Sequence, residues 1–150
     1  MAGYLGNELP QELVSFLSGG QCTVVATASN SGQLHTAVMT WVVAKDSRTI
    51  RMAMDARGRP LAHIRENPRV AIEILGDELN MAVRGAATVI KERMDAVSFP
   101  CAVVEIRVEE VMDHAVPEIR FKGPSYRYVT GKEDYYQVEK QVFAELKKEV

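Results

Sequence analysis

The sequence lacks the features of membrane, secreted and nucleic-acid-binding proteins. No apolar run approaches the roughly 20 residues of a membrane-spanning helix. The N-terminal segment MAGYLGNELPQEL has neither the basic start nor the long apolar centre of a signal peptide. A net charge of −2 over 150 residues leaves no broad basic field for nucleic acid. We therefore expect a cytoplasmic protein that binds neither membranes nor nucleic acid.

Cysteine and histidine are too few and too scattered for a metal site. Cys22 and Cys101 belong to no C-x-x-C pair, and each begins an apolar run, where a thiol behaves as a small hydrophobic group. His35, His63 and His114 stand singly rather than at the spacing of zinc ligands. We therefore expect two buried thiols and no metal, and we interpret His63 as a surface residue.

The sequence does contain a series of β-strand patterns, in a chain of the right length for one domain. It is 47% apolar and 25% charged, as is ordinary for a globular protein. Apolar or alternating runs bounded by turn residues predict six strands, at 22–29, 35–44, 49–54, 70–74, 79–90 and 101–111. Short turns at 30–32 and 45–48 predict that the first three form an antiparallel meander.

Three helices accompany the strands. Apolar residues at helical spacing predict one helix over 9–17 and another over 132–150. Between the third and fourth strands, Pro60 suits the first turn of a short helix, and Asn67-Pro68 ends it. The predicted fold class is therefore mainly β, a six-stranded antiparallel barrel, closed or nearly closed, with helices near both termini.

The segment before the short helix has the composition of an anion-binding site. A helix N-terminus presents free N–H groups and a partial positive charge. Arg57 and Arg59 add two full charges on the same side of an extended segment, and Gly58 lets the backbone approach a ligand. Composition alone leaves a second interpretation open, which is a solvated turn with two arginines.

The order of elements resembles the pyridoxamine 5′-phosphate oxidase-like FMN-binding split β-barrel proteins, over about residues 10–112. Its most specific parts are the helix that closes as IRENPRVAI and the strand AVRGAATVI. The resemblance implies a split barrel, a single flavin-binding domain over 1–150, and FMN as the cofactor. It also implies a homodimer with the flavin in a groove between protomers. It identifies no small-molecule substrate, and we name no catalytic residue.

The resemblance assigns the FMN phosphate to Arg59, with Arg57 as a second cation. Gly58 and Pro60 stand where the family has a serine and a lysine, so a hydroxyl donor and a cation are missing here. Asn80 matches a polar side chain that reaches the flavin ring, which is glutamine in a member of that family.

Two strands carry the remaining implied flavin contacts. Ala53 and Met54 match a tyrosine-threonine pair that borders the flavin. The second predicted strand matches one whose backbone, including Val38, lies along the isoalloxazine edge. In that strand His35 falls near a family arginine and Thr40 near a family lysine.

Three functions stay open. The first is an FMN-dependent oxidoreductase acting on a small or unsaturated substrate. The second is a flavin carrier or sensor without turnover. The third is a split-barrel protein that has lost FMN and binds another anionic ligand, such as a deazaflavin or haem. Pyridoxamine phosphate oxidation itself is not expected, because the segment that binds that substrate's phosphate has no match here.

Three further features bear on partners and ligands. Apolar residues on both faces of strands 35–44 and 79–90 exceed what one barrel interior buries, which favours a homodimer. Trp41 fits either the core or the face of a flavin ring. The segment 118–128 mixes aromatic and cationic residues, and it fits a solvated loop, a substrate contact or a partner contact.

Overall fold

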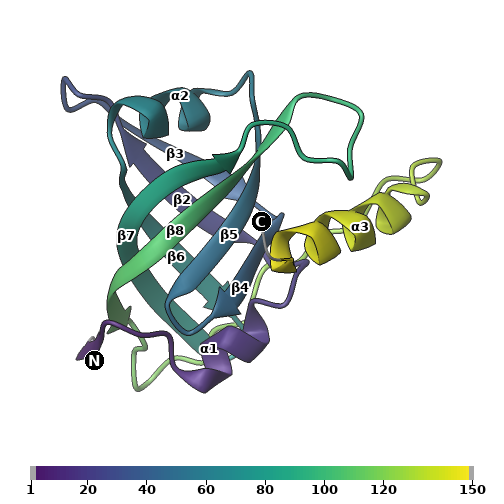
Figure 1. Cartoon of the computed structure of the whole chain (residues 1–150). Coiled ribbons are helices and arrows are strands. Elements are labelled where there is room, and N and C mark those ends of the chain that lie inside the picture. The colour runs from purple at the N-terminus through teal and green to yellow at the C-terminus, as the bar shows by residue number, and fades with distance from the viewer. Residues whose placement is uncertain (1–2, 149–150) are drawn as a thin grey trace.

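One antiparallel sheet curls into a barrel in the computed structural model, which describes residues 3–148 (Figure 1). The strand order is β3-β2-β6-β7-β8-β5-β4, and β1 pairs with β8 outside this path. The strands are β1 (Gly3–Gly6), β2 (Thr23–Ala28), β3 (Leu34–Met39), β4 (Val42–Asp46), β5 (Thr49–Asp55), β6 (Arg69–Gly76), β7 (Leu79–Lys91) and β8 (Cys101–Asp113). The helices are α1 (Gln11–Phe16), α2 (Arg59–Glu66) and α3 (Tyr135–Lys147).

This architecture confirms the predicted fold class, with α2 between β5 and β6 and a helix near each end of the chain. The predicted meander is wrong, because the second predicted strand is divided at Thr40–Trp41 into β3 and β4. β3 pairs with β2, whereas β4 pairs with β5 at the opposite end of the sheet order. The seam of the barrel therefore lies between β3 and β4. The added strand β1 also raises the number of strands above the predicted six.

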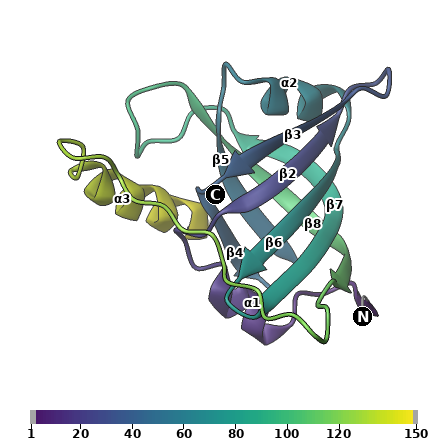
Figure 2. The same cartoon turned by 180° about the vertical axis from the view of Figure 1, so that it is seen from behind.

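The helices close and flank the barrel. Figure 1 shows α2 across one end of the barrel and α1 at the other end, while Figure 2 shows the segment after β8 running along the barrel to α3. Gly76, at the end of β6, lies against the ring of Phe16 in α1, which places the β6–β7 turn at the α1 end. The two ends of the sheet are therefore distinct, one carrying α2 and one carrying α1.

Two apolar clusters hold this arrangement together. The larger one fills the barrel and includes the alternating inward residues of β6, β7 and β8, as their sequence patterns predict. The smaller one lies outside the barrel, where α3 and the segment after β7 cover β4, β5 and β8. Its buried members are Val43, Ala53, Met94, Val97, Cys101, Val103, Val142 and Leu146.

A buried arginine fixes the C-terminal helix to the sheet. Arg51 on β5 is 4% exposed, and its Nε donates to Oε2 of Glu105 on β8 at 3.0 Å. Its Nη1 donates to the carbonyl oxygens of Leu146, at 3.3 Å, and of Lys148. Because these carbonyls end α3, Arg51 both pairs with a carboxylate and caps the helix.

Two predictions about individual residues have different outcomes. Cys101 is buried and Cys22 half-buried, and both are free thiols. Burial raises the pKa of the Cys101 thiol to about 11. The surface interpretation of His63 is wrong, because it is 7% exposed and its Nδ1 lies 3.0 Å from Oγ1 of Thr27. The buried face of α2 consists of Leu61, His63 and Ile64. This face therefore includes a polar residue beside the two apolar ones that the sequence pattern indicates.

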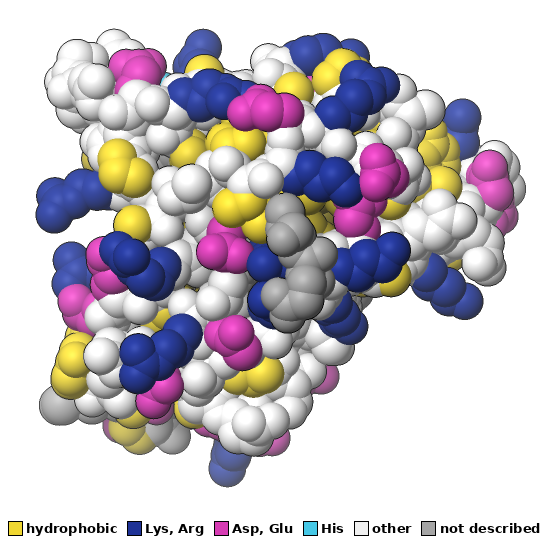
Figure 3. Space-filling model, in the orientation of Figure 1, with side chains coloured by type: hydrophobic (Ala, Val, Ile, Leu, Met, Phe, Trp, Pro, Cys, Tyr) yellow, Lys and Arg dark blue, Asp and Glu magenta, His cyan; other side chains and the backbone are white. Residues whose placement is uncertain are grey.

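Charges on the surface are mixed in sign. On the face drawn in Figure 3, lysine and arginine side chains alternate with acidic ones. Several form ion pairs, such as Arg48 with Glu8 at 2.9 Å and Arg65 with Glu92 at 2.6 Å. None of the helices in residues 3–148 has the length and the apolar character needed to span a bilayer.

Candidate functional site

The N-terminus of α2 is open to a ligand. Gly58 precedes the helix in an extended conformation, with φ −84° and ψ 157°, and provides no side-chain cap. Arg59 is the first helical residue, and Pro60 lies in the first turn as predicted. An uncapped helix N-terminus keeps its partial positive charge available to an anion. Glycine at this position leaves room close to the backbone.

The two arginines of this segment differ in their pairing. Arg57 donates from Nε and Nη2 to the two carboxylate oxygens of Asp55, at 2.9 and 2.8 Å. These hydrogen bonds lower the pKa of Asp55 to about 2, so its negative charge offsets that of Arg57 at neutral pH. The side chain of Arg59 is exposed, and no ion pair joins it to another residue within 3–148. Arg59 is therefore the unneutralised cation of this site.

Asn80 lies at the other end of the barrel. It pairs with Leu75 of β6, which is six positions beyond Arg69, the residue that begins β6 after α2. At the usual rise per residue, that separation is about 20 Å. A single chain therefore does not bring Asn80 and Arg59 together.

The side chain of Asn80 has an unused acceptor. Its Nδ2 donates to the carbonyl oxygen of His114 at 3.2 Å, which fixes the orientation of the amide. Its Oδ1 is buried and has no hydrogen-bond partner among residues 3–148. A buried acceptor without a partner costs free energy, so it is suited to a ligand that donates a hydrogen bond. The adjoining cavity, of about 230 Å³, is lined by Glu78, Asn80, Ala115, Val116, Pro117, Ile119, Arg120 and Phe121.

The candidates on β3 lie along the edge of the sheet. Val38 is 66% exposed, and its position on β3 is paired with Val24 of β2. His35 packs edge-to-face against His63, with ring centroids 6.0 Å apart. Thr40 lies at the seam between β3 and β4, beside the hydroxyl of Tyr126. The structure therefore spreads these three residues along one edge strand and its end.

The candidates on β5 have no free side chain. Met54 is 2% exposed and points into the barrel core. Ala53 belongs to the outer cluster, and its backbone N–H donates to the carbonyl oxygen of Trp41 at 3.0 Å. The tyrosine-threonine pair of the family is therefore replaced by two residues that pack within this chain.

A buried carboxylate that sequence analysis missed lies beside the seam. Glu139 of α3 is 6% exposed, and its Oε2 accepts from the Tyr126 hydroxyl at 2.6 Å and from Trp41 Nε1 at 3.3 Å. Trp41 itself packs against the outer cluster and stacks on Phe99. Since Trp41 and Glu139 lie 98 positions apart, no local pattern could have paired them.

The hydroxyl groups of Tyr126 and Tyr128 are expected to ionise at a higher pH than an ordinary tyrosine. Burial, followed by the bond to Glu139, raises the pKa of Tyr126, and the same two causes raise that of Tyr128 from 10.0 to about 12. A raised pKa means that the fold favours the neutral phenol. The contribution of Tyr128 to the free energy of unfolding is therefore complete below pH 10 and lost as the pH rises toward about 12.

Phenolate absorbance in the ultraviolet measures this titration directly. We expect a late ionisation step that is smaller in Tyr128→Phe, because Tyr126 still ionises late, and that is accompanied by loss of the folded signal in circular dichroism. Ionisation of every tyrosine in one early step, with the fold intact, would contradict the burial of this cluster.

Comparison with known proteins gives one family and many similar folds. The family model described as pyridoxamine 5′-phosphate oxidase matches residues 9–122. No curated protein matches the sequence significantly. A structure from Lactobacillus delbrueckii, named for pyridoxamine 5′-phosphate oxidase, is 21% identical with a TM-score of 0.62, and the match covers 72% of this chain and 97% of that one.

Two other structures share the fold at lower identity. An FMN-binding protein from Syntrophomonas wolfei is 11% identical with a TM-score of 0.54, over 71% of this chain and 84% of that one. An F420 reductase is 16% identical with a TM-score of 0.57, over 69% of this chain and 98% of that one. At these identities the likeness concerns the fold alone.

Proposed function

Because the chain belongs to the pyridoxamine 5′-phosphate oxidase family, we propose that it binds FMN and acts as a flavin-dependent oxidoreductase on a small molecule. The observation that carries the proposal is the unneutralised Arg59 at the uncapped N-terminus of α2. Bound FMN would supply the transfer of electrons or hydride. The residues of this chain bind the cofactor and orient it.

The phosphate end of FMN fits the start of α2. Arg59 supplies one full positive charge and two parallel N–H donors, and the helix supplies a partial positive charge. Pro60 provides neither a cation nor a backbone N–H. Arg57 is held by Asp55, so the affinity for phosphate rests mainly on Arg59.

The ring end of FMN fits Asn80. The flavin ring carries an N–H group that can donate to the unpaired Oδ1 of Asn80. The hydrogen bond from Nδ2 to the His114 carbonyl keeps this oxygen in place and unable to exchange with the amide nitrogen. The residues present are therefore compatible with a flavin at both of its polar ends.

The separation of Arg59 and Asn80 favours a site shared between two chains. A two-fold axis can bring the α2 end of one protomer next to the Asn80 end of its partner. The outer face of the β2–β3 edge is apolar and exposed, with Leu34 81%, Val38 66% and Val24 37% accessible. Such a face supports a homodimer, because its burial by a second copy is favourable.

Subunit complementation tests this shared site. We expect Arg59→Ala and Asn80→Leu each to bind FMN weakly on their own. After subunit exchange between equal amounts of the two variants, about a quarter of the sites should regain normal affinity, because each mixed dimer has one intact site. Absence of any recovery, with exchange verified by labelled subunits, would contradict a site between protomers.

Release of Arg57 is expected to tighten FMN binding. Asp55→Asn keeps an oxygen for the backbone N–H of Arg57, at present bonded at 2.9 Å, but removes the charge that neutralises the guanidinium. The affinity for FMN should rise several-fold, as measured by titration.

Asp46→Asn is the matched control for this change. Asp46 accepts a hydrogen bond from the backbone N–H of Arg48 at 2.9 Å, in the same two-residue spacing, but is the last residue of β4. It should leave the affinity unchanged. A fall in affinity for Asp55→Asn would show that Asp55 serves the site through its charge and would refute the role given to Arg57.

A deazaflavin is the second candidate cofactor. One structure of the same fold is named an F420 reductase, and the loss of the family lysine at Pro60 weakens the case for FMN. Parallel titrations with FMN and F420 distinguish the two by affinity. Oxidation of NAD(P)H by the flavin-loaded protein then separates an oxidoreductase from a carrier or sensor.

A further inference from the structure

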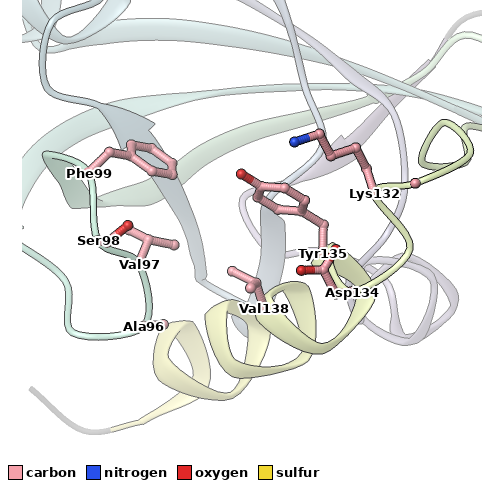
Figure 4. A pocket seen from close by; sticks show the side chains of 9 residues that line it. Ala96, Val97, Ser98, Phe99, Lys132, Asp134, Tyr135 and Val138 are labelled. Carbon is pink, nitrogen blue, oxygen red and sulfur yellow. The ribbon is translucent and has the colours of Figure 1, made fainter.

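A groove separate from the flavin candidates lies between the segment after β7 and the start of α3. Its volume is about 460 Å³, within the usual range for small-molecule sites. Figure 4 shows Phe99 on one side and Tyr135 on the other, with both rings reaching into the space between them. The side chains used in this proposal are those of Ser98, Phe99, Lys132, Asp134, Tyr135 and Val138.

The two aromatic walls are held from behind. Phe99 stacks on Trp41, with centroids 6.1 Å apart and an angle of 29° between the planes. Tyr135 stacks on Tyr128 at 5.5 Å and 17°. Because each ring already packs against a second ring, neither is free to turn into the groove and fill it.

The buried Glu139 links the supports of both walls. Its Oε2 accepts from Trp41 Nε1, behind Phe99, and from the hydroxyl of Tyr126. Tyr126 in turn packs edge-to-face on Tyr128, which stands behind Tyr135, with centroids 6.3 Å apart. One connected set of hydrogen bonds and ring contacts therefore supports both walls.

The groove has one unneutralised cation. Lys132 extends its ammonium group into the space beside Tyr135 (Figure 4), and no ion pair joins it to another residue within 3–148. The one carboxylate of the lining, Asp134, is at the N-cap of α3, where the helix dipole favours its charge. The guanidinium of Arg57, 6.0 Å from the Phe99 ring, is paired with Asp55.

We propose that this groove binds a planar aromatic molecule with one anionic group. The ring lies between Phe99 and Tyr135 and packs on Val138, and the anionic group pairs with Lys132. Two fixed aromatic faces favour a flat ring by stacking, and an unpaired ammonium selects negative charge. Neither Arg59 nor Asn80 lines the groove, and Arg57, the second candidate for the flavin phosphate, lies 6.0 Å from the Phe99 ring at its edge.

Calorimetric titration with 2-naphthoate and its neutral amide, 2-naphthamide, tests the proposal on the protein without added flavin. We expect saturable binding of naphthoate, with the amide several-fold weaker. Lys132→Met should remove this difference without abolishing binding of the amide. Tyr135→Ala should weaken both ligands about tenfold, since it removes one wall.

Three controls keep the result interpretable. Tyr4→Ala removes an exposed tyrosine of β1, 66% accessible, and should change neither affinity. Phe99→Leu removes the aromatic ring but keeps apolar bulk against Trp41, so it disturbs folding less than alanine would. It should weaken the binding of both ligands. Arg59→Ala should weaken FMN but leave naphthoate unaffected, so the failure of either proposal is visible separately.

Three outcomes would overturn the proposal. The first is the absence of saturable naphthoate binding at millimolar concentration. The second is an equal affinity for naphthoate and naphthamide, with neither affinity changed by Tyr135→Ala. The third is loss of naphthoate binding in Arg59→Ala, which would assign the ligand to the flavin site.

Discussion

Replacing Arg59 with alanine is expected to weaken FMN binding by about 1–3 kcal/mol, or roughly five- to 150-fold. Arg59 is exposed at the first position of α2, where no side chain caps the helix. Its charge is not neutralised by any residue within 3–148. The phosphate of FMN therefore depends on it more than on any other side chain of the segment. Quenching of flavin fluorescence during titration measures the affinity.

Two other arginines serve as controls for this result. Arg57→Ala should cost less, because the guanidinium it removes is already bound to Asp55. Arg65→Ala should have no effect, since Arg65 lies at the far end of α2 and pairs with Glu92 at 2.6 Å. Unchanged affinity in Arg59→Ala would refute the assignment of the phosphate to this helix, whatever the other variants do.

Replacing Gly85 with alanine is expected to lower the free energy of unfolding by about 2–4 kcal/mol. A Cβ at this position would lie 2.3 Å from the carbonyl oxygen of Arg107 and 2.9 Å from Cγ2 of Ile106. The nearer atom belongs to the backbone, so no change of rotamer relieves the contact. The pairing of β7 with β8 shifts register between Arg84 and Gly85, which accounts for the close approach.

Gly3→Ala is the matched control, because nothing lies within 4 Å of its Cβ position and it too is in a strand paired with β8. Urea denaturation followed by circular dichroism gives both free energies. If Gly85→Ala lowered the free energy of unfolding no more than Gly3→Ala does, the close approach of Gly85 to the Arg107 carbonyl would be contradicted.

Local patterns were sufficient to predict much of the fold. Alternation of apolar and polar residues predicted β6, β7 and β8 and the faces that they bury. Pro60 and Asn67-Pro68 gave the ends of α2, because proline restricts the backbone at both positions. These strands and helix ends depend on residues close together in the sequence, so local sequence patterns are enough to predict them.

The division of residues 35–44 could not be predicted in the same way. Both halves have a strand composition, and the short turns on either side are typical of a meander. The chain nevertheless passes at Thr40–Trp41 from β3 to β4, whose partners are β2 and β5 respectively. This choice is decided by pairing across the barrel, which no local pattern contains.

The pairings of the candidate side chains could not be predicted from the sequence. Arg57 was predicted as a second cation for the phosphate, and the structure pairs it with Asp55, two residues earlier. The inward turn of His63 depends on Thr27, and the contact of Trp41 depends on Glu139. Each of these interactions joins side chains whose relation is set by tertiary structure.

Titration of the unmodified protein with FMN tests the central claim most directly. The flavin absorption spectrum and the quenching of flavin fluorescence should change together and saturate at one FMN for each chain. An unchanged spectrum and undiminished fluorescence, with the protein folded and in excess, would contradict flavin binding and would mean that this chain has kept the split barrel without its cofactor.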